Sequence, residues 1–141
     1  MAKKKKKPDT PPMYTGKRRR AVARARIEPG TGIVKINAVP VDLIQNELIR
    51  LRVLEPLLLV GDAYKKFNIT VNATGGGQLG QADAARQAIA RSLVAQLGDE
   101  AKKVFLSYDR NLLVYDARRT EPHKPPRSSQ GPRRYKQRSK R

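Results

Sequence analysis

The distribution of charge along the chain limits folding to its central part. Residues 1–26 carry eleven Lys and Arg side chains and one acid, and residues 117–141 carry ten basic residues and one acid. Residues 27–116 contain ten of each sign. A strongly cationic segment repels itself, whereas a neutral segment can pack. We therefore predict a small neutral domain between two basic arms whose partner is a nucleic acid, because binding phosphates relieves the repulsion and releases counterions.

The predicted organisation is a basic extension over residues 1–13, a folded domain over 14–116 and an extended basic tail over 117–141. The Lys3–Lys7 run and the prolines after it predict disorder, and both an electrostatic arm and a nuclear import signal fit this composition. Because those prolines stand where a secretory signal needs apolar residues, and the longest apolar run is Leu57–Val60, we expect a soluble, intracellular protein without a membrane span.

The predicted elements alternate between strands and helices. In chain order they are strands at Lys17–Ile27 and Ile33–Val39, a helical segment at Val41–Val60 divided at Pro56, a strand at Phe67–Thr74, helices at about Gln81–Leu97 and Asp99–Tyr108, and a short strand at Leu112–Asp116. The first helical segment carries apolar residues at Ile44, Leu48, Leu51, Leu54 and Leu58, and the predicted buried stripe of the Gln81–Leu97 helix is Ala85, Ile89, Leu93 and Leu97. A turn at Glu28–Gly32 would join the first two strands into a hairpin. The fold class is α+β, with two to three helices layered on a four-stranded mixed sheet.

The first predicted strand carries a candidate phosphate-binding face. Alternate residues of a strand share a face, so Arg18, Arg20, Arg24 and Arg26 would project together, while small apolar residues project towards the core. At ~3.3 Å per residue these arginines would follow several consecutive phosphates. A solvated charged face is the alternative, although a solvated surface usually mixes both signs of charge.

A glycine cluster lies between a predicted strand and a predicted helix. Gly75, Gly77 and Gly80 satisfy G-x-G-x-x-G, the pattern of dinucleotide-binding folds. That site also needs a second strand ending in an acid about twenty residues further on, and Asp99 instead opens a helix. Glycines at a helix start nevertheless leave backbone N–H groups free for an anion. We predict that Gly75, Gly76 and Gly77 receive an RNA phosphate.

The remaining residues give little support to catalysis. The chain has no cysteine, and its single histidine, His123, lies in a Pro-rich stretch that cannot fix the position of an imidazole. We predict no catalytic residue, no metal and no cofactor. The alternatives to a specific RNA-binding protein are an RNA-recognition module, which would need a strand octapeptide that this chain lacks, a protein that compacts DNA, and an enzyme.

The carboxyl-terminal segment from residue 117 is predicted to be an extended arm that reaches on the order of 80 Å. Its paired arginines are suited to backbone phosphates: Arg118, Arg119, Arg133 and Arg134. The chain ends in Ser139, Lys140 and Arg141, which combine two cations with a hydroxyl. An inert solubilising tail is the alternative interpretation.

Several of these segments resemble a known family. They are Tyr14–Arg24, Gly75–Gln81 with the helix that follows, Leu112–Arg119, and the ending Ser139–Arg141. In this order they are similar to small-subunit ribosomal protein S-nine over roughly residues 14–141, and Leu54–Leu59 is closer to its archaeal and eukaryotic branch. The resemblance implies a two-layer α+β core with a left-handed crossover, located in the head of the small ribosomal subunit.

The resemblance also implies partners and a location. We expect small-subunit ribosomal RNA, peptidyl-site tRNA and neighbouring ribosomal proteins as partners, at the cytoplasmic ribosome, without catalysis or homo-oligomers. The expected ribosomal RNA contacts are Lys17, Arg18, Arg20, Arg24, Arg26, Gly75, Gly76, Gly77, Arg118, Arg119, Arg133 and Arg134. The expected tRNA contacts are Ser139, Lys140 and Arg141.

Overall fold

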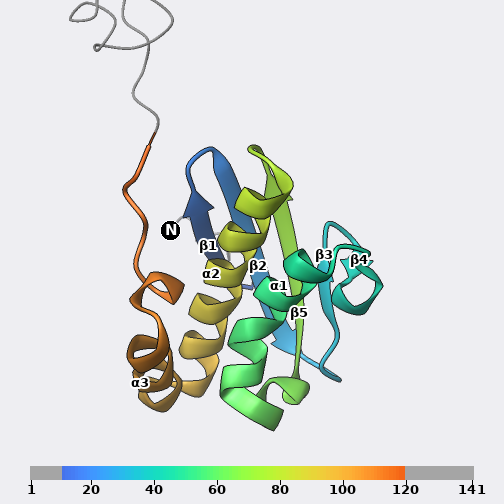
Figure 1. Ribbon diagram of the computed structural model, residues 1–141. Coiled ribbons are helices and arrows are strands. Elements are labelled where there is room, and N and C mark those ends of the chain that lie inside the picture. Colours follow the sequence, from blue (N-terminus) through green and yellow to red (C-terminus); the bar gives the residue numbers. More distant parts are fainter. Residues whose placement is uncertain (1–10, 120–141) are drawn as a thin grey trace, which may run out of the picture.

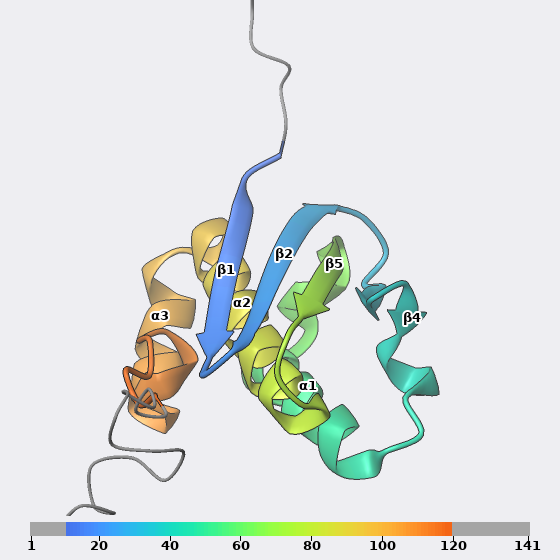
Figure 2. The same ribbon diagram turned by 90° about the horizontal axis from the view of Figure 1, so that it is seen from above.

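Five strands form one mixed sheet, and the helices lie together on one of its faces (Figure 1, Figure 2). The computed structural model describes residues 11–119. The strands are β1 (Met13–Arg18), β2 (Ala21–Pro29), β3 (Val34–Ile36), β4 (Val39–Pro40) and β5 (Phe67–Thr74), in the spatial order β1-β2-β5-β3-β4. The helices are α1 (Glu47–Val60), α2 (Gln78–Leu97) and α3 (Asp99–Tyr108), with short 3-10 turns at Val41–Leu43, Gly61–Lys66 and Arg110–Leu112. The predicted α+β class is confirmed, but the strands differ: the predicted strands Lys17–Ile27 and Ile33–Val39 each divide into two, and the predicted strand at Leu112–Asp116 does not form. Ile33–Val39 turns at Asn37 and Ala38, which both adopt positive φ, so that β3 and β4 form a small hairpin.

The crossover between the parallel strands is left-handed, as the resemblance implied. β3 and β5 pair in parallel, and α1 connects them. In Figure 1 β5 runs upward with β3 to its right, and α1 crosses on the viewer's side of the sheet. A chain that moves leftward over the near face in this way turns left-handed, against the usual preference for right-handed crossovers.

Small residues bring β1 and β2 very close to α2. The inward residues of β2 are Ala21, Ala23, Ala25 and Ile27, and the buried face of α2 includes Ala84, Ala85, Ala88, Ile89 and Leu93. Gly16 of β1 is buried against the same helix, and a Cβ atom there would overlap the carbonyl oxygen of Ala84 and the amide nitrogen of Ala88. The backbones of strand and helix therefore touch at Gly16, where no other residue type fits.

The predicted first strand is in fact two strands. Lys17–Ile27 turns at Arg19 and Arg20, where Arg19 adopts a φ of 53°, so that β1 and β2 form the hairpin. The predicted pairing of β2 with the strand near residue 34 is also wrong, because β5 lies between them. β5 pairs with β2 along eight residues, whereas β3 has only three residues that could pair with β2. The β2–β5 pairing therefore forms more backbone hydrogen bonds than a β2–β3 pairing could.

The structure corrects the prediction for the first helical segment as well. Helix α1 begins at Glu47, capped by the Asn46 side chain, and continues through Pro56 instead of dividing there. Burial of Val53, Pro56 and Leu57 compensates for the hydrogen bond that proline cannot donate. Three of the regularly spaced apolar residues of this segment are about half exposed or more: Leu48 (54%), Leu51 (53%) and Leu58 (71%). Apolar residues surround this helix, so periodicity alone did not identify its buried side.

Candidate nucleic-acid interface

The face of the sheet opposite the helices is polar and basic. We define the outer sheet face by the residues that alternate with the buried ones: Thr15, Lys17, Val22, Arg24, Arg26, Lys35, Thr70, Asn72 and Thr74. Cross-strand register groups them into rows, such as Thr15 beside Arg24 beside Asn72. Four of the nine are cations, and the same alternation continues to Glu28, an exposed acid of β2 that pairs in register with Asn68 in the next outward row after Arg26. This face therefore exposes positively charged side chains together with uncharged hydrogen-bond donors.

Arg18 does not belong to this face, which corrects the sequence prediction. The turn at Arg19 and Arg20 shifts its alternation, so Arg18 projects towards the helices with Gly16. There its guanidinium forms ion pairs with Asp83 of α2, at 3.6 Å, and with Asp116. Lys17, by contrast, points outward with Arg24 and Arg26. The predicted basic face is thus present with Lys17 in place of Arg18, and Arg20 lies at its end in the turn.

Arg18 is part of a balanced network of ion pairs. It joins Arg18, Arg52 and Arg118 through Asp83 and Asp116, and a second group beside it joins Arg86 to Glu55 and Asp109, so that four arginines face four carboxylates. Together the two groups connect β1, α1, α2 and the segment after α3, with N–O distances of 2.5 Å for Arg52–Asp83 and 2.6 Å for Arg86–Glu55. The Tyr108 hydroxyl also bonds to Glu55, which raises the pKa of that phenol. These four arginines are therefore neutralised locally, unlike the cations of the outer sheet face.

The glycine cluster has a structural explanation as well as a functional one. Gly75 and Gly76 have φ values of 75° and 64°, and Cβ atoms there would meet the Arg20 carbonyl oxygen and the backbone of Ala21. The loop is thus packed on the β1–β2 turn, and the fold itself needs these two glycines. Gly77 differs, because its φ is −100° and a Cβ atom would meet nothing within 4 Å. Gly77 is the N-cap of α2, and no side chain caps the first N–H groups of this helix.

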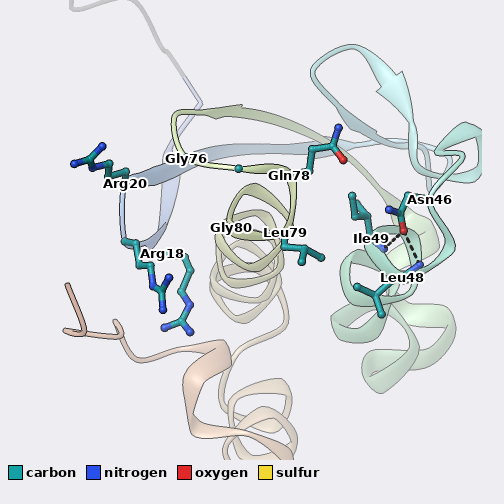
Figure 3. Close-up of a pocket in the computed structure, with 11 residues that line it drawn as sticks. Arg18, Arg20, Asn46, Leu48, Ile49, Gly76, Gln78, Leu79 and Gly80 are labelled. Carbon is teal, nitrogen blue, oxygen red and sulfur yellow. Dashed lines mark hydrogen bonds between the residues drawn. The ribbon is translucent and has the colours of Figure 1, made fainter. Parts of the chain in front are cut away.

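A cleft of about 890 Å³ lies between the starts of the two longest helices. Figure 3 shows Leu79 of α2 pointing towards Leu48 and Ile49 of α1. The lining is completed by Arg18, Arg19, Arg20, Asn46, Gly76, Gly77, Gln78 and Gly80. Its floor is apolar, its rim carries arginines, and it contains no acidic residue.

Two side chains of α2 fix the start of the carboxyl-terminal segment to the edge of β1. Gln87 is buried, accepts a hydrogen bond from the Lys17 amide (2.9 Å) and donates to the Val114 carbonyl (2.7 Å). Arg91 donates to the carbonyls of Thr15 (2.6 Å) and Leu113 (2.8 and 3.0 Å). Burial lowers the pKa of the Arg91 guanidinium. We call residues 113–119, held in this way, the tail junction.

The tail junction explains why the predicted strand at Leu112–Asp116 does not form. An added strand would need the free backbone groups at the edge of β1, but Gln87 and Arg91 already bond to Lys17 and Thr15 there. The junction is instead a 3-10 turn followed by irregular backbone. Further along, Arg118 pairs with Asp116, and Arg119 bonds to the Tyr115 hydroxyl with its guanidinium 5.8 Å from the ring centre.

Replacing Gln87 by Ala is expected to free the tail junction. The amide of Lys17 and the carbonyl of Val114 lose their partner, so the free energy of unfolding should fall by roughly 2 kcal/mol. Hydrogen exchange should show faster exchange at the Lys17 amide. Gln96→Ala, at an exposed position of the same helix, is the matched control and should change stability by less than about 0.5 kcal/mol. Unchanged exchange at Lys17 in the Gln87 variant would contradict the role of this side chain.

The structure thus brings some predicted residues together and separates others. Lys17, Arg24 and Arg26 share the outer sheet face, and Arg20 and the glycines lie at one end of it, whereas Arg118 and Arg119 belong to the tail junction. The sequence does not indicate that the candidate interface also includes Lys35, Asn72 and Arg19, because their positions depend on strand register and on the β1–β2 turn. Arg133, Arg134, Ser139, Lys140 and Arg141 lie outside the described residues, as does most of each arm.

Other kinds of site find no support in residues 11–119. No cluster of three or more His, Cys, Asp or Glu side chains there is arranged to hold a metal ion. Over the same residues, no helix has the length and apolar character needed to cross a membrane.

Comparisons with known proteins agree with the sequence resemblance. The family described as Ribosomal protein S9/S16 matches residues 16–141. A protein of Methanococcus vannielii named small ribosomal subunit protein uS9 is 46% identical over 125 residues, which cover 88% of this chain and 93% of its own. The protein of the same name from Desulfurococcus amylolyticus is 53% identical over 111 residues, 78% of this chain and 79% of its own. The chain therefore belongs to the ribosomal protein S9/S16 family, in the archaeal-type branch of the small-subunit proteins named uS9.

Proposed function

We propose that this protein is a structural constituent of the small ribosomal subunit that binds ribosomal RNA through the outer sheet face. One observation carries the proposal: Lys17, Arg24, Arg26 and Lys35 are exposed together on a face without helices, while four arginines on the helix side, Arg18, Arg52, Arg86 and Arg118, are paired with carboxylates. Unpaired cations on an open surface can replace the counterions of phosphates, whereas paired cations gain little from doing so. The family consists of structural ribosomal proteins at the cytoplasmic ribosome, and no catalytic step is proposed.

Recognition through this face would depend on the RNA backbone. Arg24 and Arg26 lie two residues apart on one strand, about 7 Å along it, and Thr70, Asn72 and Thr74 of the neighbouring strand add uncharged donors. Lys and Arg contacts to phosphates give affinity and register but carry no base sequence. At one end of the face, Arg19, Arg20 and the free N–H groups of α2 would hold a further phosphate near Gly77. Binding is therefore expected to weaken steeply with salt.

The two basic arms would add contacts to ribosomal RNA, and the carboxyl-terminal tail would also reach peptidyl-site tRNA. The tail begins at a fixed junction, held by Gln87 and Arg91, so that it leaves the domain in a defined direction. We propose that Arg118, Arg119, Arg133 and Arg134 contact ribosomal RNA along its path. Ser139, Lys140 and Arg141 at its end would contact the backbone of peptidyl-site tRNA, without regard to the anticodon sequence. Arg118 and Arg119 are exposed, and each has only an intramolecular partner that a phosphate can displace.

Deletion of Ser139–Arg141 tests the tail separately from the domain. Small subunits assembled with the truncated chain should sediment normally, because the outer sheet face is intact. Their retention of peptidyl-site tRNA should fall by about tenfold, as expected for the loss of two charge-assisted contacts to phosphates. Filter binding of labelled tRNA to salt-washed subunits measures the effect. Undiminished tRNA retention would refute the tail contact, and failed assembly would assign the last three residues to incorporation instead.

A further inference from the structure

The cleft between α1 and α2 combines two surface types that rarely occur together. Its floor exposes large apolar side chains, since Leu48 is 54% and Leu79 50% exposed although neither is needed in the core. Its rim carries Arg19 and Arg20, both exposed, and no acidic residue lines it. An apolar floor under a cationic rim matches a ligand with one flat apolar part and one anionic part.

The N-terminal end of α2 indicates where in the cleft the anionic part of such a ligand would lie. Gly77 provides no capping side chain, and the first turn of α2 lines the cleft together with Arg19 and Arg20, so its uncapped N–H groups and the helix dipole favour an anion at this end. The N-terminal end of α1 is different, because the Asn46 side chain accepts bonds from the amides of Leu48 and Ile49. The anionic part of a ligand would therefore lie at the α2 side of the cleft, and the apolar part between Leu79 and Leu48.

The cleft is continuous with the outer sheet face. Lys17, Val22 and Thr74 form the last row of that face, and the chain passes from Thr74 directly into the glycine loop that borders the cleft. The β1–β2 turn with Arg19 and Arg20 stands between the two surfaces. An RNA strand that follows Arg26, Arg24 and Lys17 across the sheet would arrive at this turn.

We infer that the cleft binds a single unpaired nucleotide that is turned out of an RNA helix. The base would lie on Leu48, Ile49 and Leu79, and its phosphate at the first turn of α2 and the arginine rim. Bases inside an A-form helix cannot be reached in this way, since the major groove is narrow and deep. Only a bulged or looped-out nucleotide presents its base face and its phosphate separately. The inference rests on the proposed function, because it assumes that the protein binds RNA.

The test compares two RNA hairpins that differ by one unpaired nucleotide. The full-length protein should bind the bulged hairpin about tenfold more tightly than the fully paired one, because burial of the base face adds to the shared phosphate contacts. The double variant Leu48→Ser with Leu79→Ser should reduce this preference to less than about twofold. Its affinity for the paired hairpin and its salt dependence should not change, since no charge is altered. With 2-aminopurine at the unpaired position, fluorescence should rise severalfold on binding the unmodified protein and much less with the variant.

Matched controls separate the possible failures. Leu51→Ser with Leu58→Ser removes two equally or more exposed leucines of α1 that do not line the cleft, and should leave the preference for the bulge intact. Equal affinity of the unmodified protein for both hairpins would overturn the inference while leaving RNA binding itself in place. Salt-independent or absent binding of both hairpins would overturn the proposed function. A cleft variant that keeps its bulge preference but fails to enter subunits would show that the cleft binds a protein, which also overturns the inference.

Discussion

Replacing Gly16 by Ala is expected to destabilise the protein more than any other single methyl group added to the described domain. The new Cβ atom would overlap the carbonyl oxygen of Ala84 and the amide nitrogen of Ala88, which are backbone atoms of α2 and cannot rotate away. Helix and strand must then separate, so the free energy of unfolding should fall by about 3 kcal/mol. For a domain of this size the melting temperature should fall by roughly 15 °C, measured by circular dichroism.

Gly80→Ala is the matched control for this prediction, because Gly80 belongs to the same contact between α2 and the hairpin. Its added Cβ atom would lie 3.5 Å from the Cβ of Ala21, an ordinary contact distance. Alanine also favours the helix over glycine by up to about 1 kcal/mol, so this variant should be as stable as the original or slightly more. Equal melting temperatures for the Gly16 and Gly80 variants would show that β1 and α2 are not in direct backbone contact.

Removal of the four cations of the outer sheet face is expected to abolish most of the affinity for ribosomal RNA. A variant with Lys17, Arg24, Arg26 and Lys35 all changed to Gln should lose about three units from the slope of log K against log salt. At 0.1 M salt this corresponds to roughly a thousandfold weaker binding. Fluorescence anisotropy with a labelled small-subunit RNA fragment, titrated at several salt concentrations, gives both numbers.

The control variant removes four positive charges from positions outside the outer sheet face. Lys65, Lys66, Lys102 and Lys103 are exposed outside the outer sheet face, and their change to Gln lowers the net charge equally. Affinity should then fall by less than about tenfold, since only long-range attraction is reduced. Equal losses in the two variants would mean that the protein binds RNA through its overall charge, which would refute the proposed interface.

Elements with a strict local pattern were predictable from the sequence. Strand β5 was predicted with its observed bounds, because apolar and polar residues alternate from Phe67 to Thr74 without exception. The buried positions Ala85, Ile89 and Leu93 of α2 follow from helical spacing, and Gly98 ends that helix in a left-handed conformation. In each case the signal lies within a few residues of the element that it specifies.

Features that depend on distant contacts were not predictable. The β1–β2 turn has no glycine, proline or asparagine at its corner, and Arg19 adopts a positive φ because the Gly75 loop packs against the following residue. The exposure of Leu48 depends on how α1 rotates against the core. The absence of a strand after Leu112 depends on Gln87 and Arg91, which lie more than twenty residues earlier.

The residues of the candidate interface also fall into two groups, those that a local pattern predicts and those that depend on distant contacts. Arg24 and Arg26 were identified because they alternate with alanines within β2, and this alternation is visible in the sequence. Lys35 joins them only through the pairing of β3 with β5, and Asn72 through that of β5 with β2. Arg18 was assigned to the wrong face, since one unexpected turn reverses the alternation of every residue before it. The distribution of charge along the chain therefore indicates a nucleic-acid partner, whereas the residues of the outer sheet face depend on strand register.

The attachment of Gln87 and Arg91 to β1 also affects the protein before it joins a ribosome. A bare outer strand offers unsatisfied amides and carbonyls to which a strand of another chain can add, and this is a common route to aggregation. Here α2 side chains occupy the Lys17 amide and the Thr15 carbonyl, and β4 at the opposite border is only two residues long. Newly made copies that await assembly thus present few free backbone groups at the sheet edges to which a strand of another chain could add.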